Sequence, residues 1–353
     1  MSRLLDVSPG GLTYAQAGVD IAAGDEAVEH IKQSVRSTNR PGVLGGIGGF
    51  GGLFQLDLNR YKQPVLVAST DGVGTKLEIA RQMNRYDTIG LDLVAMLVDD
   101  LACVGAEPLF LLDYVAVGKL DPSKLEEIVA GIAEGCRMTN TALLGGETAE
   151  HGGVLRHDDV DVAGFVVGVI EKGHELGAER VKAGDVIIGF SSPGLRSNGY
   201  SLARRVLVEK EERLFEPAFE GSERVLGEEL LLPSVIYTPA ILAVQGALRD
   251  ALHAVAHITG GGIVGNVPRA LPKNLDAHIE MASFLTPEIF FEIQRRGNVS
   301  ADEMVRVFNC GLGMTVFLEK DAASEALDIA SKAGIVATVV GEVREGSGTV
   351  MLW

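Results

Sequence analysis

Apolar stretches of two kinds alternate along most of the chain and predict its secondary structure. Short runs rich in β-branched residues are typical of buried strands, and they occupy residues 65–68, 108–117, 142–144, 160–170, 185–190, 254–258 and 336–343. Apolar residues at helical spacing lie between these runs and predict helices over residues 25–36, 87–103, 122–136, 287–296 and 321–333. Strands and helices mix without a strict alternation, so the pattern predicts an α+β (α/β-like) fold with mixed sheets.

A charged, glycine-containing segment at residues 171–184 separates two halves of similar pattern. The chain has 353 residues, which is enough for two domains that each bury a core. We therefore expect an N-terminal domain over residues 1–171 and a C-terminal domain over residues 172–353.

The expected helix at residues 87–103 is apolar nearly all round, yet it carries Asp92, Asp99 and Asp100. A helix without a polar face is buried, and a buried carboxylate is costly unless a cation pairs with it. Asp92 and Asp99 are seven residues apart and lie nearly on one face. The cation is either a metal ion or a Lys or Arg side chain from elsewhere. Asp71, close by in the sequence, favours magnesium, and the salt-bridge alternative stays open.

The segment PVLVASTDGVGTK at residues 64–76 combines the end of a strand, a glycine turn and the start of a helix. Backbone N–H groups at such a turn bind phosphate, and Asp71 at the strand end can hold a cation beside it. The order Gly-Thr-Lys and the missing upstream glycine exclude a Walker A loop. A tight connection without a ligand is the alternative that this segment alone leaves open.

Other glycine-rich segments also lie at predicted strand ends or in loops. Residues 45–52 contain GxGxxG, but no strand precedes them and no helix follows, so a flexible loop is favoured over a dinucleotide site. The strand at 142–144 ends in glycines followed by Glu147, and the strand at 254–258 leads into a Thr-Gly-Gly-Gly turn. His257 precedes that turn, and a core histidine is the more frequent interpretation than a catalyst.

Charge and cysteine content narrow the choice of partners and compartment. The 31 basic and 48 acidic residues give a net charge of −17, which disfavours nucleic acid and anionic membranes because both require a basic face. Cys103, Cys136 and Cys310 lie far apart in apolar surroundings, so we expect buried free thiols, with a reactive Cys310 as the alternative. The N-terminus lacks the apolar core of a signal peptide, and the longest apolar run is too short to span a bilayer. We therefore expect a cytoplasmic protein.

Nine motifs occur in a fixed order over about residues 13–345: GGIGGFGG, STDGVGTKL, GLDLVAMLVDDL, GAEPLFLLDYVAVGKLD, GGETAE, DVAGFVVGVIEK, RSNGYSLAR, HITGGGI and FNCGLGM. This set closely resembles the phosphoribosylformylglycinamidine cyclo-ligases, the aminoimidazole ribonucleotide synthetases of purine biosynthesis. The resemblance implies ATP- and Mg²⁺-dependent ring closure of formylglycinamidine ribonucleotide to 5-aminoimidazole ribonucleotide, with release of ADP and phosphate. It also implies a homodimer whose N-terminal halves pair to complete a barrel-like sheet.

The resemblance further implies a set of site residues at matching motif positions. The ATP site would contain Lys32, Asp71, Gly72, Val73, Gly74, Thr75, Lys76, Gly146 and Glu147. Magnesium would be held by Asp71, Asp92, Asp100 and Glu147, and catalysis would involve Asp92 and Lys76. The substrate would contact Gly48, Gly49, Phe50, Gly51, Ser197, Asn198, Thr259, Gly260 and Gly261.

Two positions depart from the pattern of the family that the chain resembles. Asp99 stands where many members carry Asn, which adds a charge beside the expected metal site and obscures which acid is the ligand. Arg196 stands where some members carry His, so no histidine is assigned as general base.

Two other functions remain open within the same ATP-binding superfamily. A small-molecule kinase would transfer phosphate to its product, whereas a cyclo-ligase releases it. A nucleotide-binding maturation factor without turnover typically extends into a cysteine-bearing tail, whereas this sequence ends in Val-Met-Leu-Trp. A dehydrogenase is the weakest alternative, because the GxGxxG segment lacks its strand and helix.

Overall fold

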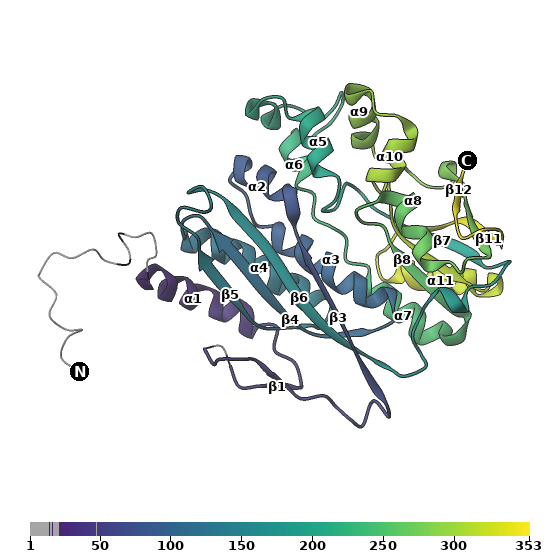
Figure 1. The fold of residues 1–353 in the computed structure, drawn as a ribbon, viewed down its shortest axis with the longest axis horizontal. Coiled ribbons are helices and arrows are strands. Elements are labelled where there is room, and N and C mark those ends of the chain that lie inside the picture. Colours follow the sequence, from purple (N-terminus) through teal and green to yellow (C-terminus); the bar gives the residue numbers. More distant parts are fainter. Residues whose placement is uncertain (1–13, 15, 17–20, 47) are drawn as a thin grey trace, which may run out of the picture.

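Two β-sheets, one from each half of the chain, organise the fold (Figure 1). The structure is a computed structural model, and it describes Tyr14, Gln16, residues 21–46 and residues 48–353. A four-stranded sheet has the strand order β3-β6-β4-β5, and a six-stranded sheet has the order β12-β9-β11-β7-β10-β8. The mixed α+β architecture predicted from the sequence is confirmed. The domain boundary at residue 171 stays a prediction; β6 ends at Glu171 and the next strand begins at Val186.

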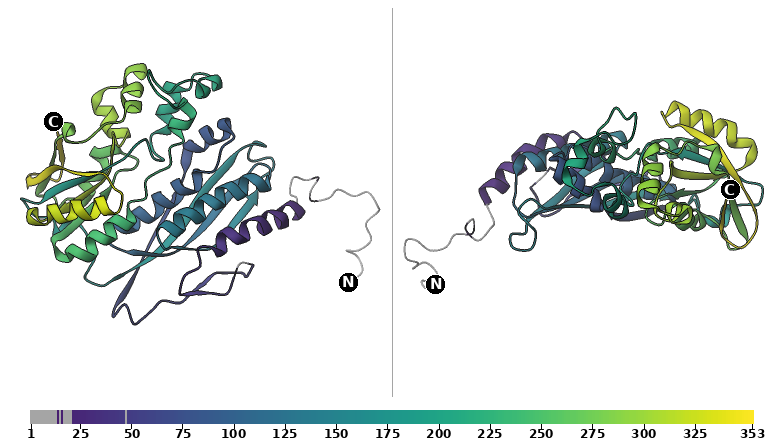
Figure 2. Two further views of the ribbon diagram at one scale, coloured as in Figure 1. Left: turned by 180° about the vertical axis from the view of Figure 1, so that it is seen from behind. Right: turned by 90° about the horizontal axis from the view of Figure 1, so that it is seen from above.

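The four-stranded sheet carries helices on one face only (Figures 1 and 2). Its strands are β3 (Pro64–Gly72), β4 (Glu107–Val117), β5 (Ala142–Glu150) and β6 (Val160–Glu171). Only β4 and β5 are parallel, and the crossover between them is α4 (Pro122–Met138), which Asp121 caps through the backbone N–H groups of Ser123 and Lys124. α3 (Ile89–Cys103) packs beside α4, and α1 (Ile21–Arg36) lies on α4 and β5.

The six-stranded sheet is antiparallel except for its β9–β12 pair. Its strands are β7 (Val186–Ser191), β8 (Leu252–His257), β9 (Leu275–Ile279), β10 (Leu312–Leu318), β11 (Ala337–Glu345) and β12 (Val350–Leu352). Helices α7 (Thr238–Leu248) and α11 (Ala323–Lys332) pack together on it. The remaining helices are α5 (Tyr200–Leu207), α6 (Leu226–Leu230), α8 (Gly262–Asn266), α9 (Glu288–Gly297) and α10 (Ala301–Val307).

Helix α3 lies between the two halves, which explains its apolar surface (Figure 1). On one side it packs against β3 and β6, where a Cβ added to Gly164 would lie 2.7 Å from the Leu97 side chain. On the other side it contacts α7 and β8 of the C-terminal half. Enclosed by two sheets, the helix leaves only Leu91, Asp100 and Cys103 partly exposed, so the prediction of a buried helix is confirmed.

The segment that follows β3 has the expected strand–turn–helix form. After β3 the chain makes a 3₁₀ turn at Gly74–Lys76 and continues directly into α2 (Leu77–Met83). Gly74 has a φ of +69°, in the left-handed region that favours glycine. The short strands β1 (Val43–Leu44) and β2 (Leu53–Phe54) pair with each other and flank the first glycine-rich segment. Across the described part of the chain, no helix has the length and apolarity to cross a membrane.

Candidate active site

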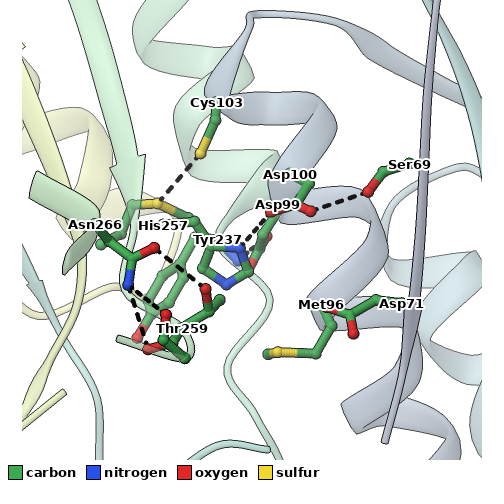
Figure 3. A network of polar contacts seen from close by, with 12 residues as sticks. Ser69, Asp71, Met96, Asp99, Asp100, Cys103, Tyr237, His257, Thr259 and Asn266 are labelled. Atoms are coloured by element: carbon green, nitrogen blue, oxygen red, sulfur yellow. Dashed lines mark hydrogen bonds and ion pairs between the residues drawn. The ribbon is translucent and has the colours of Figure 1, made fainter. Parts of the chain in front are cut away.

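Asp71, Asp100 and His257 meet at the seam between the two halves (Figure 3). Asp71, near the end of β3, accepts a 2.7 Å hydrogen bond from the Gly72 N–H through Oδ1. Asp100, on α3, accepts a 2.9 Å hydrogen bond from the Ser69 hydroxyl. Its other oxygen lies 2.9 Å from Nδ1 of His257, at the end of β8. The structure thus brings together two predicted metal ligands and a histidine that the sequence had left open.

The charge states of these two carboxyl groups differ because of their surroundings. Burial raises the pKa of Asp71, and the nearby charge of Asp100 raises it further. Burial acts in the same direction on Asp100, but the hydrogen bond and charge of His257, with the Ser69 hydroxyl, outweigh it and lower its pKa. Asp100 is therefore the readily ionised member, and a cation beside the pair would relieve the repulsion between the two acids.

A cavity of 330 Å³ adjoins these residues between the halves, and both Asp100 and His257 line it. Among the described residues, Nε2 of His257 has no hydrogen-bond partner, and the side chain is only 3 % exposed. Asn266 and Arg269 line the same cavity, so it presents both donors and acceptors. These groups suit a polar, charged ligand better than an apolar one.

The residues predicted to border the substrate from the C-terminal half are brought together. Asn266 donates hydrogen bonds from Nδ2 to the carbonyls of Thr259 (3.3 Å) and Gly260 (3.2 Å), which fixes the turn after β8 (Figure 3). A Cβ added to Gly260 would lie 3.5 Å from Oδ1 of Asn198, so the turn and the Ser197–Asn198 segment are neighbours. Gly261 has a φ of +98°, which explains the glycine there.

Asp92 and Lys76 form a fully buried ion pair, with Oδ2 and Nζ 2.6 Å apart. Oδ1 of Asp92 accepts hydrogen bonds from the Ser234 N–H (2.8 Å) and hydroxyl (2.6 Å). Nζ of Lys76 also donates to the Leu232 carbonyl at 2.7 Å. Burial lowers the pKa of Lys76, and Asp92 opposes that shift. Both side chains are fully buried in this pair, which favours the salt-bridge alternative over the expected contacts of Asp92 with metal and of Lys76 with phosphate; the assignment of both residues to the active site stays a prediction.

Glu147 lies far from the other predicted metal ligands within the chain. It is exposed on β5, whereas Asp71 is on β3 at the opposite edge of the four-stranded sheet. Within the described residues, no three His, Cys, Asp or Glu side chains are placed so that they could hold one metal ion. Asp71, Asp92, Asp100 and Glu147 are therefore not brought together within one described chain, and their assignment as metal ligands stays a prediction.

A second cavity, of 410 Å³, lies between α1 and β5 and contains two of the predicted ATP residues. Gly146 and Glu147 line it. Lys32 is on α1 and pairs with Glu29 on the helix surface, and it does not line this cavity. The Gly146 position requires glycine, because an added Cβ would lie only 1.5 Å from a carboxylate oxygen of Asp113.

Asp113 is a further candidate that the sequence analysis missed. It lies in one cross-strand row with Asp71, since both residues pair with Gly164 of β6. Burial raises its pKa to about 7, and it lines the cavity between α1 and β5. One signal was present: a single carboxylate within the apolar strand at residues 108–117.

The predicted glycine loop connects β1 and β2 at the edge of the N-terminal half. Gly48 has a φ of +106°, and the Phe50 side chain between the glycines is fully exposed. At the base of the loop, a Cβ added to Gly52 would lie 2.4 Å from the Leu144 side chain. The base of the loop thus lies beside β5, where Gly45, Gly46 and Gly52 line a small cavity with Leu144. Contact of Gly48, Gly49, Phe50 and Gly51 with the substrate stays a prediction.

Comparison with known proteins defines first the class of the chain and then its family. Family models for the N-terminal and C-terminal domains of AIR synthase related proteins match residues 56–170 and 182–353. Curated phosphoribosylformylglycinamidine cyclo-ligases are similar over nearly the whole chain. That of Alkaliphilus oremlandii is 47 % identical and covers 97 % of this chain and 99 % of its own length. That of Carboxydothermus hydrogenoformans is 49 % identical, with 97 % and 98 % covered. The chain therefore belongs to the phosphoribosylformylglycinamidine cyclo-ligase family, as its motifs predicted.

Two solved structures have folds similar to that of this chain. Thiamine-monophosphate kinase from Stenotrophomonas maltophilia has a TM-score of 0.66 at 19 % identity, covering 93 % of this chain and 95 % of its own. The hydrogenase maturation protein HypE in complex with ATP has a TM-score of 0.63 at 16 % identity, with 98 % and 92 % covered. At these identities the likeness shows the fold alone.

Proposed function

We propose that this chain catalyses the ATP-dependent ring closure of formylglycinamidine ribonucleotide to 5-aminoimidazole ribonucleotide in purine biosynthesis. The observation that carries the proposal is the 47 % identity to a curated cyclo-ligase over 97 % of the chain. The polar cleft at Asp100 and His257 is consistent with it, because it joins both halves around charged groups. A kinase and a nucleotide-binding maturation factor are disfavoured, since their resemblance to this chain is confined to the fold.

ATP is the second substrate, and its phosphates fit the end of β3. Asp71 precedes the 3₁₀ turn there, and the exposed residues Gly74 and Thr75 belong to the turn itself. Magnesium fits the oxygen donors beside it: the Asp100 side chain is 40 % exposed, and only Oδ1 of Asp71 has a hydrogen bond among the described residues. When bound, the metal would neutralise charge on the phosphate oxygens. Asp71 and Asp100 would hold it, and Asp92 would not.

The chemistry requires a leaving group, because the formyl-amide oxygen leaves poorly by itself. Transfer of the γ-phosphoryl group from ATP to that oxygen makes it a phosphate ester, and the amidine-side nitrogen then displaces phosphate to close the ring. Positioning and electrostatic stabilisation dominate such a transfer. The described cleft offers acids, glycine turns and His257 for these tasks, and the unpartnered Nε2 of His257 is placed to exchange a hydrogen bond with a ligand.

An oxygen label tests this sequence of steps directly. Substrate that carries ¹⁸O at the formyl oxygen is incubated with the protein, ATP and Mg²⁺, and the products are analysed by mass spectrometry. We expect the aminoimidazole product and ¹⁸O-labelled inorganic phosphate. Label in water, or on a phosphorylated side chain, contradicts the mechanism, and a phosphorylated small-molecule product with no free phosphate indicates a kinase.

We also propose that the protein is a cytoplasmic homodimer, joined through the uncovered face of the four-stranded sheet. Leu66 of β3, Tyr114 of β4 and Phe165 of β6 expose 65 %, 39 % and 42 % of their surface there. Apolar side chains on three adjacent strands are typical of an interface, and a second copy supplies the complementary face.

Light scattering during gel filtration tests the dimer. We expect Leu66→Lys with Phe165→Lys to elute as a monomer, while Leu285→Lys, at an 80 % exposed apolar residue of the other half, leaves the dimer intact. A wild-type monomer, or a double variant that remains dimeric, excludes this interface.

A further inference from the structure

Arg196 is buried to 1 % exposure although it is a cation, and its contacts reach across the domain seam. It lies in the loop between β7 and α5, and its Nη2 is 2.7 Å from Oδ2 of Asp99 on α3. The guanidinium also donates to the carbonyls of Val235 (3.0 Å) and Gly313 (3.2 Å). Its face lies 4.7 Å from the centre of the Tyr237 ring, at cation–π distance.

Asp99 uses both carboxylate oxygens in the same network. Its second oxygen accepts three hydrogen bonds of 2.9 Å, from the backbone N–H groups of Tyr237 and Thr238 and from the Thr238 hydroxyl. These donors lie at the start of α7, where a negative charge is favoured. Asp99 is therefore saturated by protein donors, and the pair ties the N-terminal half to two segments of the C-terminal half.

The backbone at Arg196 is held in an uncommon conformation by these contacts. Its φ is +63°, in the left-handed region that residues other than glycine rarely adopt. Three residues later Gly199 has a φ of +79°, and a Cβ there would lie 2.3 Å from the Phe308 ring. Ser197 and Asn198 thus lie between two residues with left-handed backbone conformation, Arg196 and Gly199. Of these two, only Arg196 has a side chain whose contacts can hold that conformation.

Asn198 lies beside Met96 of α3 and beside the turn after β8. Among the described residues, the Ser197 hydroxyl is buried without a hydrogen-bond partner. Nδ2 of Asn198 lies 3.6 Å from Sδ of Met96, and its Oδ1 is beside Gly260. An unsatisfied buried hydroxyl is costly, so a ligand that supplies its partner is favoured there.

We propose that Arg196 is a positioning residue for substrate binding: its ion pair with Asp99 across the seam holds Ser197 and Asn198 in the geometry that receives the substrate. Arg196 acts through that segment and does not itself contact the substrate. The inference rests on the proposed function, because it takes formylglycinamidine ribonucleotide as the substrate. Asp99 and Arg196, the two positions that depart from the family pattern, are thus energetically coupled. Replacing either residue alone leaves the charge of the other buried and unpaired.

A double-mutant cycle tests the coupling. The variants are Asp99→Asn, Arg196→His and the combination of both, which is free of fixed charge and places His, a residue tolerant of left-handed φ, at position 196. Steady-state kinetics are measured against formylglycinamidine ribonucleotide at saturating ATP. We expect each single variant to raise KM about 10-fold or more with kcat changed by less than about 3-fold, and the double variant to return KM to within about 3-fold of wild type.

Asp185→Asn is the matched control. Asp185 forms a buried pair with His253, 2.7 Å apart, at the opposite end of β7 from the Ser197–Asn198 segment. We expect this variant to lower the melting temperature while KM for the nucleotide substrate stays at the wild-type value. A merely structural role of Arg196 would give the same result as this control.

The possible outcomes separate the inference from the proposed function. Folded single variants with wild-type KM, or losses that multiply in the double variant, overturn the positioning role. If Arg196→His does not fold, Arg196→Lys replaces it, because lysine keeps the charge but lacks the planar fork; an unchanged KM in that variant also overturns the role. Wild-type protein that makes no aminoimidazole product refutes the proposed function, whereas an active wild type with unaffected variants refutes only the inference.

Discussion

The acids of α3 fall into two groups that share one helix but differ in their surroundings. Asp92 and Asp99 are fully buried, and each pairs with one cation and accepts further hydrogen bonds from the C-terminal half. The side chain of Asp100, one residue further along, is 40 % exposed and lines the cleft with His257, and its charge acts on nearby Asp71 (Figure 3). The first group has no free oxygen for a ligand, whereas the second retains incompletely satisfied groups at a cavity. A carboxylate in an apolar helix can therefore form an ion pair between domains as readily as it can bind a metal ion. The exposure of its side chain distinguishes the two roles.

The largest effect is expected from the exposed group. Under the proposed function, Asp71→Asn removes a charge beside the transferring phosphoryl group, and we expect the rate of phosphate release to fall about 10³-fold. Because Asp71 is already disfavoured in its charged form, the melting temperature should stay the same or rise. Activity and thermal unfolding are measured on the same preparation. A variant that loses activity only in proportion to its loss of folded protein would place Asp71 with the structural group.

Asp92→Asn is the corresponding test of the buried group. It leaves Lys76 charged without its partner, and we expect a loss of about 3 kcal/mol in the free energy of unfolding. Activity per folded molecule should change little. Combining this substitution with Lys76→Met removes the unpaired charge and should recover most of the stability. The amide oxygen of the introduced asparagine can still accept a hydrogen bond from the Ser234 N–H. Denaturant titration of both variants measures this, and an inactive but fully stable Asp92→Asn protein would restore Asp92 to the catalytic group.

Asp113 tests burial without a cationic partner. Its pKa of about 7 lies above the reference value of 3.8, so between these two pH values the folded state binds a proton that the unfolded state has released. Its contribution to stability is thus present at low pH and is lost as pH rises toward 7. We expect Asp113→Asn to be more stable than wild type by about 1–2 kcal/mol at pH 8 but not at pH 4. Equal stabilisation at both pH values would exclude this titration.

The glycine loop at residues 45–52 is expected to give the smallest energetic effect, since it contributes little to either core. Six of its eight residues are glycine, so ordering it costs entropy that ligand contacts must offset. We expect limited proteolysis to cut near residues 40–55 in the free protein and ATP with substrate to protect this region. Equal cleavage with and without ligands would show that the loop does not close over them.

The sequence predicts local features of this fold well, because they depend on neighbouring residues. The strand–turn–helix at residues 64–83 and the buried helix at residues 89–103 follow from apolar spacing and glycine placement alone. The identity of the family also follows from the motifs, since their order extends over both halves.

The partners of the buried acids depend on contacts between residues far apart in the sequence. Asp92 is satisfied by Ser234, and Asp99 by Arg196, and no local pattern connects those positions. Lys76 follows a phosphate-type turn directly, yet the 3₁₀ geometry at Gly74–Lys76 makes it the one buried residue of that turn. The distance between Glu147 and Asp71 could not be predicted for the same reason. The order of the strands places these residues at opposite edges of the four-stranded sheet, and the sequence pattern leaves that order undetermined.

The three cysteines occupy three different parts of this architecture. Cys103 lies on α3 with Sγ 3.9 Å from Sδ of Met314 across the seam (Figure 3). Cys136 lies in α4, and Cys310 precedes β10. Burial raises the pKa of each thiol, that of Cys310 to about 12, so alkylating reagents find almost no thiolate in the closed protein. Cys103 is partly exposed and lines the cavity between the halves, so its labelling rate reports access to that cavity, while Cys136 and Cys310 report the opening of each half. The native chain thus contains chemical probes for following its opening without any added label site.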